Sequence, residues 1–143
     1  MRFFVINRKV ATFTDKEVLL ASSKVKTLDD SSFDEVLAAA NGPVLVEFTA
    51  TWCGPCRVQA AVLERVAAEN PGLYIGAVDV DDFPELAARY AVRGMPTLVV
   101  FNGGKETNRR LGLANEQAVA ALVAGTAGGA HAAEARRAAV PSL

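Results

Sequence analysis

The chain has 143 residues, of which 51% are hydrophobic and 22% are charged, as expected of a globular domain that buries an apolar core. Its 15 basic and 16 acidic residues nearly cancel, so bulk charge gives no support for binding to nucleic acid or to a membrane. No apolar stretch is long enough for a transmembrane helix or a secretory signal, so we expect a cytoplasmic protein.

The first expected elements are a strand, a helix and a second strand. Residues 25–28 are typical of a short strand, and Ser32 and Glu35 have the spacing of a capping box that starts a helix ending near Ala40. Residues 44–48 are apolar at nearly every position, which indicates a strand buried on both faces.

A second helix and a third strand follow. Helical periodicity extends from about residue 54 to residue 70, where Val58, Val62 and Val66 fall on one apolar stripe. After this helix, residues 73–80 predict a strand.

The last expected elements are a short helix, a hairpin and a final helix. Asp82 is a candidate cap for the short helix, with Pro84 in its first turn. Residues 97–101 predict a strand whose hairpin partner lies at 105–111, and Asn115 is positioned to cap the final helix. The order β-α-β-α-β-α-β-β-α predicts an α/β fold, with a mixed central sheet covered by helices on both faces.

Charge and composition divide the chain into three segments. Residues 1–26 carry six basic and two acidic residues, whereas residues 27–125 carry seven basic and thirteen acidic residues. We predict an N-terminal extension at 1–24, one domain at 25–125 and an alanine-rich C-terminal tail at 126–143. The extension contacts the acidic domain, binds an anionic partner or is a solvated surface segment.

The only two cysteines, Cys53 and Cys56, form a C-x-x-C pair where a buried strand ends and a helix begins. The only histidine, His131, lies in the tail, so a Cys–His catalytic pair is not expected and a zinc site within one chain lacks ligands. In a reducing compartment such a pair is typical of redox chemistry or metal binding rather than of a structural disulfide. A metal site shared between two chains is therefore an alternative.

The position of the pair favours redox chemistry. Unpaired N–H groups and the helix dipole stabilise an anion, so the pKa of Cys53 should fall and its exposed thiolate should attack a substrate disulfide. Cys56 lies one turn into the helix, about 5.5 Å away between Cα atoms, and would attack the mixed disulfide to release the reduced substrate. Pro55 suits the first turn and stiffens the small ring.

Two nearby residues are candidates for supporting this exchange. Glu47 interrupts the apolar strand six residues before Cys53, where burial would raise the pKa of its carboxyl towards that of a general base for Cys56. The alternative is simple alternation, in which Glu47 faces solvent. Trp52 is either a packing residue or an exposed platform for substrate.

These residues resemble the thioredoxin family over about residues 25–125. The resemblance implies a thioredoxin-like fold and a thiol–disulfide oxidoreductase that reduces protein disulfides, with no bound cofactor besides the redox-active Cys53–Cys56 disulfide. The matching segments are 28–33, 44–48, Trp52-Cys53-Gly54-Pro55-Cys56, 90–97, Phe101-Asn102-Gly103-Gly104 and Gly112.

The resemblance also implies roles for single residues. Cys53 matches the family's attacking cysteine, Cys56 its resolving cysteine, and Pro96 a proline that is cis and lies beside them. Met95 would then offer its backbone to an extended substrate segment, whereas the residues alone indicate only a proline at a strand start. The implied substrate-binding residues are Trp52, Gly54, Pro55, Gly94, Met95, Pro96 and Gly112.

Three residues depart from the family pattern. Glu47 stands where the family usually has the shorter aspartate, and Ala77 stands where many members have a lysine near that acid. Because a cation would lower the pKa of the acid, its absence should raise the pKa of Glu47 further. Thr49 occupies a position often held by a second tryptophan.

We therefore expect a cytoplasmic, monomeric protein-disulfide reductase that acts in electron transport and cell redox homeostasis. In the family, the electrons come from NADPH through thioredoxin reductase, and the substrates are disulfide-containing proteins. No role for nucleic acid, membrane or metal is expected. The alternatives are a disulfide oxidase or isomerase that uses the same cysteines, and an adaptor that uses the fold only for binding.

Overall fold

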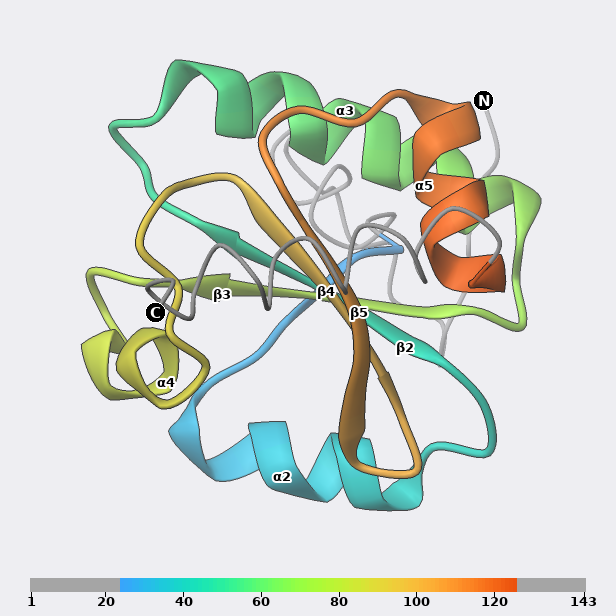
Figure 1. Cartoon of the computed structure of the whole chain (residues 1–143), viewed down its shortest axis with the longest axis horizontal. Helices are drawn as coiled ribbons and strands as arrows, with labels where there is room; N and C mark the ends of the chain where they lie inside the picture. The colour runs from blue at the N-terminus through green and yellow to red at the C-terminus, as the bar shows by residue number, and fades with distance from the viewer. Residues whose placement is uncertain (1–23, 126–143) are drawn as a thin grey trace, which may run out of the picture.

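The computed structural model describes residues 24–125, so the predictions for the N-terminal extension and the C-terminal tail lie outside the described residues. Within 24–125, strands and helices alternate in the predicted order (Figure 1). No helix in this range is both long and apolar enough to cross a membrane. The elements are β1 (Lys26–Thr27), α2 (Asp30–Ala39), β2 (Val44–Thr49), α3 (Gly54–Glu69), β3 (Tyr74–Asp79), α4 (Pro84–Arg89), β4 (Thr97–Asn102), β5 (Lys105–Leu111) and α5 (Glu116–Ala124).

The strands form one mixed sheet in the order β1-β3-β2-β4-β5. β2 pairs in parallel with β3 and antiparallel with β4, and β4 and β5 form the predicted hairpin. β1 pairs in parallel with β3 at one edge. Because β2 lies in the centre, every residue from Val44 to Phe48 is buried, as its apolar sequence predicts.

Helices cover both faces of the sheet, which confirms the predicted α/β fold. In Figure 1, α3 and α5 lie on one face, and α2 and α4 lie on the other. Side chains alternate along β2, so Val44, Val46 and Phe48 pack with α2 and α4, whereas Leu45 packs with α3 and α5. Glu47 follows Leu45 by two positions and therefore points to the α3 face.

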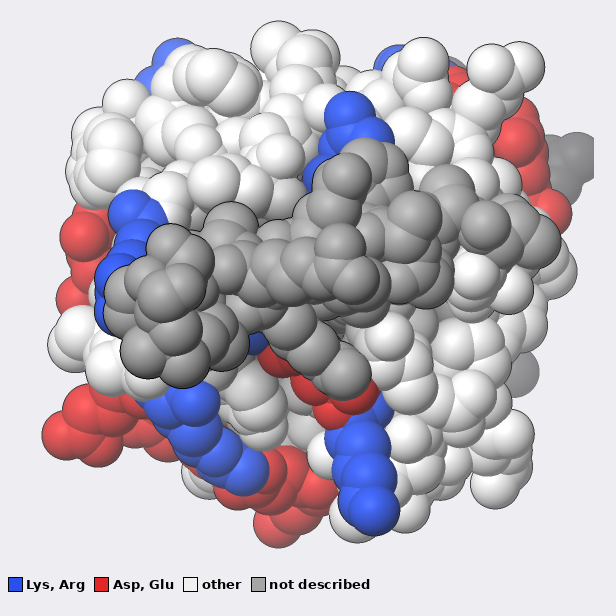
Figure 2. Space-filling view, in the orientation of Figure 1, with Lys and Arg blue, Asp and Glu red and all other residues white. Residues whose placement is uncertain are grey.

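Charged side chains of neighbouring elements pair at the surface. On the face shown in Figure 2, Lys and Arg side chains lie in several places, some of them beside acidic side chains. The guanidinium of Arg89 on α4 donates to both carboxylate oxygens of Asp34 on α2, at 2.8 and 3.0 Å. Exposed pairs of this kind contribute little to stability, so the packing of α2 and α4 depends mainly on the buried core that both helices share.

The start of α2 differs from the sequence prediction. Asp29, not Ser32, caps the helix: its carboxylate accepts the N–H of Ser32 at 2.8 Å, and the Ser32 hydroxyl accepts the N–H of Asp29 at 3.0 Å. The predicted role of Glu35 is wrong, because the helix already begins at Asp30. Asp29 and Ser32 together form the capping box.

The start of α4 also differs, whereas the start of α5 is as predicted. Phe83, not Asp82, holds the cap position of α4, and no side chain bonds to that helix end. Asp82 instead donates its N–H to the carboxylate of Asp79 at 3.4 Å. Pro84 begins α4 as predicted, and Asn115 accepts an N–H of α5 at 2.8 Å.

The apolar stripe of α3 is confirmed for Val62 and Val66, which are buried, but is wrong for Val58, which is exposed. The buried face runs from Cys56 through Gln59 at helical spacing, so the glutamine occupies the place expected for the valine. The buried face of α3 is therefore determined by its contacts with the rest of the fold and not by hydrophobicity alone.

Replacing Asp29 with alanine removes the cap of α2 and should measurably lower the free energy of unfolding, because the N–H of Ser32 loses its acceptor. Glu35 provides a matched control, because Glu35→Ala removes an exposed carboxylate from the same helix and should change stability by less than about 0.5 kcal/mol. Urea unfolding measures both variants. A larger loss in Glu35→Ala than in Asp29→Ala would contradict this cap.

Candidate active site

The two cysteines lie at the junction between β2 and α3. Cys53 is the cap residue of α3 and Pro55 lies in its first turn, as predicted. Cys53 and Cys56 form a disulfide, and their Cα atoms are 5.3 Å apart. Within residues 24–125, no cluster of three or more His, Cys, Asp or Glu side chains is arranged to hold a metal ion.

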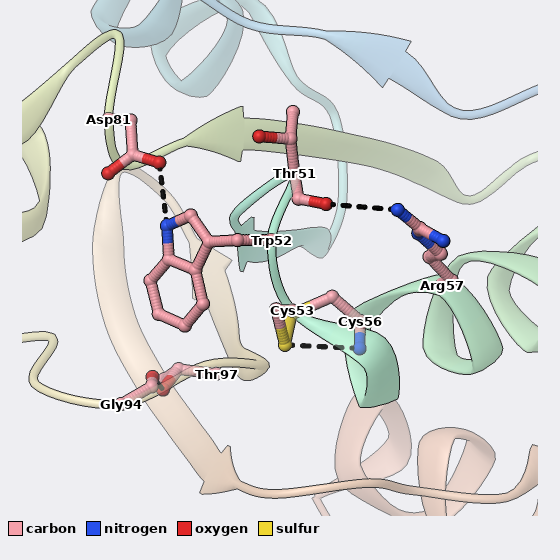
Figure 3. The surroundings of a disulfide bond; sticks show 8 residues. All are labelled: Thr51, Trp52, Cys53, Cys56, Arg57, Asp81, Gly94 and Thr97. Carbon is pink, nitrogen blue, oxygen red and sulfur yellow. Dashed lines mark hydrogen bonds between the residues drawn. A yellow bond between two sulfur atoms is a disulfide. The ribbon is translucent and has the colours of Figure 1, made fainter.

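The start of α3 supplies a hydrogen-bond donor to the sulfur of Cys53. The N–H of Cys56 donates to the Sγ atom of Cys53 at 3.2 Å (Figure 3). The same donor, together with the helix dipole, stabilises a thiolate at this position when the disulfide is reduced. The helix end therefore supplies the donor that the strand-to-helix junction predicts, and the lowered pKa of Cys53 in the reduced protein stays a prediction.

The disulfide is more enclosed than the sequence analysis predicts. Cys53 is 6% exposed and Cys56 is 2% exposed, so an exposed Cys53 is wrong for the oxidised protein. Both cysteines pack with Ala50, and the partly buried Val80 and Met95 close around this small cluster. Cys56 is nevertheless the deeper of the two, as predicted.

Glu47 is buried on the face of the sheet that α3 covers. It is 2% exposed, and among residues 24–125 its Oε2 atom has no hydrogen-bond partner. Its partners in register are Ala77 on β3 and Leu98 on β4, neither of which can compensate a negative charge. Burial raises the pKa of Glu47 to about 7. The raised pKa is confirmed, and a solvent-facing Glu47 is wrong.

Trp52 is exposed, and its ring is held in place by a residue that the sequence analysis missed. The side chain is 67% exposed, which rules out the packing role for Trp52. Its indole N–H donates to a carboxylate oxygen of Asp81 at 2.8 Å (Figure 3). Asp81 follows β3 as Trp52 follows β2, and the ends of parallel neighbours lie together. The parallel pairing of β2 and β3 was therefore a signal that could have predicted the contact between Trp52 and Asp81.

The segment around Pro96 lies beside the cysteines. The Met95-Pro96 peptide bond is cis, as the resemblance implies, and Met95 packs against the cysteine cluster. The Thr97 hydroxyl donates to the carbonyl of Gly94 at 2.6 Å. The N–H of Gly112 donates to the carbonyl of Pro96 at 2.9 Å, and its φ of +95° is one that glycine adopts without strain.

Three further residues near Gly112 were missed. Leu111 and Leu113 are large exposed apolar side chains, and a Cβ atom on Gly94 would lie 3.1 Å from Leu111. Gln59 is fully buried and bonds to the backbone just after Leu113. The leucines could have been found as neighbours of Gly112 in the sequence, but no sequence signal marks Gln59.

The comparisons agree with this geometry. The thioredoxin family model matches residues 24–125. The thioredoxin of Chlamydia caviae is 39% identical over 99 residues, which cover 69% of this chain and 95% of that protein. The bifunctional thioredoxin reductase/thioredoxin of Mycobacterium leprae is 41% identical over 100 residues, covering 69% of this chain and 22% of that protein. A mutant thioredoxin from Halobacterium salinarum has a TM-score of 0.65 at 34% identity, covering 73% of this chain and 91% of that chain.

The chemistry of the site follows from the cysteine pair. Two thiols that form a disulfide within one helical turn carry two electrons between them, so the exchange needs no bound cofactor. The fold, the pairing of Cys53 with Cys56 and the family match all point to the same activity. The chain therefore belongs to the thioredoxin family and is a thiol–disulfide oxidoreductase that reduces protein disulfides.

Proposed function

We propose that Cys53 is the attacking cysteine and Cys56 the resolving cysteine. The Cys53 thiolate attacks one sulfur of the substrate disulfide, that bond breaks, and the other substrate sulfur leaves as a thiolate. Cys56 then loses its proton and attacks Cys53, which releases the second substrate thiolate and forms the Cys53–Cys56 disulfide. The hydrogen bond from the N–H of Cys56 to the Cys53 sulfur supports this order, because it stabilises only the Cys53 thiolate.

Glu47 accepts the proton that Cys56 loses. Because burial raises its pKa to about 7, the carboxyl can both take up and release a proton near neutral pH in each cycle. Glu47 is buried on the face of the sheet that α3 covers, and Cys56 lies in the first turn of α3. This arrangement supports the role. Ala77, in place of the lysine found in many members, cannot supply a cation that would lower the pKa of the acid.

Exposed and half-buried residues around the disulfide, together with the buried Pro96, bind an extended segment of the substrate protein. Gly54, which is also exposed, lies between the cysteines, and Met95 offers backbone groups beside them. Leu111 adds apolar surface next to Gly94. The full set that we assign to this substrate surface is Trp52, Gly54, Pro55, Gly94, Met95, Pro96, Leu111, Gly112 and Leu113.

Thioredoxin reductase restores the dithiol with electrons from NADPH. The Mycobacterium leprae relative supports this partner, since its name joins thioredoxin reductase and thioredoxin in one protein. In this assignment the chain is a monomeric electron carrier of the cytoplasm that contributes to redox homeostasis. Electrons pass from NADPH to the reductase, then to the Cys53–Cys56 pair, and finally to a protein disulfide.

NADPH and thioredoxin reductase should keep the protein turning over on insulin as a disulfide substrate. The measurement is NADPH consumption, with insulin omitted in one control and this protein omitted in another. No consumption with a reductase that is active on another thioredoxin would overturn the proposed electron source. A net oxidation of reduced substrate instead would favour the oxidase alternative.

Serine variants of the two cysteines separate their roles. Cys56→Ser should trap the substrate as a mixed disulfide on Cys53, because the resolving thiol is gone, whereas Cys53→Ser should trap nothing. Non-reducing electrophoresis and mass spectrometry detect the adduct. An adduct on Cys53→Ser alone would reverse the roles, and full activity of both variants would favour the adaptor alternative.

Glu47→Gln should change how stability depends on pH. Folding raises the pKa of Glu47 from 4.5 to about 7, so the stability gained from the protonated form is present below pH 4.5 and is lost as pH rises through about 7. The glutamine does not ionise, so the variant does not lose this stability. Between acid and mildly alkaline pH, its free energy of unfolding should therefore rise relative to that of the wild type by on the order of 3 kcal/mol. Urea unfolding of the oxidised proteins measures it, because neither cysteine then titrates.

Exposed Glu35→Gln is the control and should follow the wild type across this pH range. A constant difference between Glu47→Gln and wild type would contradict the raised pKa. The proton-transfer role has its own readout: resolution of the mixed disulfide should slow in the wild type as pH falls below about 7. In Glu47→Gln the same step should be slower at neutral pH and should lose the break near pH 7, because Cys56 must then lose its proton to solvent.

A further inference from the structure

We propose that Gln59 is a positioning residue that holds the Gly112 side of the substrate surface at a fixed place relative to the cysteine pair; this rests on the substrate surface proposed above. Gln59 is fully buried and lies in α3, three residues after Cys56. A buried amide needs hydrogen-bond partners, and the rest of this helix face is largely apolar. Its partners therefore indicate what the residue does.

Both ends of the Gln59 amide bind the backbone of one residue. Its Nε2 atom donates to the carbonyl of Ala114 at 3.0 Å, and its Oε1 atom accepts the N–H of Ala114 at 2.7 Å. Two bonds to one residue fix the distance and the orientation of that backbone relative to α3. Ala114 is itself buried, so removing the amide leaves its N–H and carbonyl without this partner and out of reach of bulk water.

This tether acts on the substrate surface because Ala114 directly follows Leu113. Two positions before Ala114, Gly112 donates its N–H to the carbonyl of Pro96 at 2.9 Å. The segment 111–113 is thus held on one side by the cis-proline segment and on the other by Gln59. Through these bonds Gln59, 55 positions before Ala114 in the sequence, fixes the segment 111–113 to the helix that carries the cysteines.

The expected consequence concerns binding more than sulfur chemistry. Without the hydrogen bonds of Gln59, the segment 111–113 can shift relative to α3. A substrate bound across this segment would then have no fixed position relative to the disulfide. A large protein substrate needs both features at once and should bind more weakly. A small disulfide that contacts only the sulfurs should react as before.

Gln59→Met tests this, because it keeps the length and bulk of the side chain and removes both hydrogen bonds. With dithiothreitol as the electron donor, the KM for insulin should rise roughly 5- to 10-fold, the effect of losing about one buried hydrogen bond's free energy. The kcat for insulin should change less than about twofold, and so should the rate at which the reduced protein, separated from dithiothreitol, reacts with dithiobis(nitrobenzoate). Equal losses with both substrates would overturn the positioning role.

Two further variants make the result decisive. Val66→Ala lowers stability from the same buried helix face but leaves the tether intact, so its KM for insulin should equal that of the wild type. A matching rise in Val66→Ala would reduce the effect of Gln59→Met to lost stability and overturn the inference. Leu111→Ser tests the substrate surface itself.

If Leu111→Ser raises the KM for insulin and Gln59→Met does not, the substrate surface stands and the inference about Gln59 is wrong. If neither variant changes the KM, the proposed substrate surface fails, and the inference fails with it. A rise in both, with Val66→Ala unchanged, supports the tether.

Discussion

The hydrogen bond from the N–H of Cys56 to the sulfur of Cys53 is the interaction on which the rest of the site depends. One helical turn both stabilises the first thiolate and brings the second thiol within disulfide distance, with the Cα atoms 5.3 Å apart. The helix starts there because β2 and β3 are parallel neighbours, and their connection must cross over one face of the sheet. The start of α3 therefore lies at the carboxyl end of the central strand.

The covered sheet that positions α3 also creates the buried acid. Alternation along β2 turns Glu47 to the α3 face, where Ala77 and Leu98 flank it and burial raises its pKa to about 7. An uncompensated carboxyl of this kind reduces stability at neutral pH, where it ionises, and the same property makes it a proton acceptor near neutral pH. Stability and proton transfer are therefore opposed at this one position.

Much of the fold could be predicted because its signals are local. The order of elements, the hairpin and the Asn115 cap depend on residues within a few positions of one another. The prediction was wrong where two local patterns competed. Ser32 fits both as the cap of a helix in which Glu35 completes the capping box and as the third residue of a helix capped by Asp29. It was also wrong at Val58, because the contacts of α3, and not the helical period alone, decide which face is buried.

The sequence by itself determined the redox chemistry, since a C-x-x-C pair at a helix start brings a stabilised thiolate and its resolving partner together within four residues. Only the tertiary structure decided which distant groups surround that pair. Trp52 meets Asp81 across 29 positions, and Gln59 meets Ala114 across 55, and neither contact leaves a local pattern. The direction of Glu47 was likewise open until β2 was placed at the centre of a sheet covered on both faces. Contacts between distant segments depend on how the elements pack, and packing is a property of the whole fold.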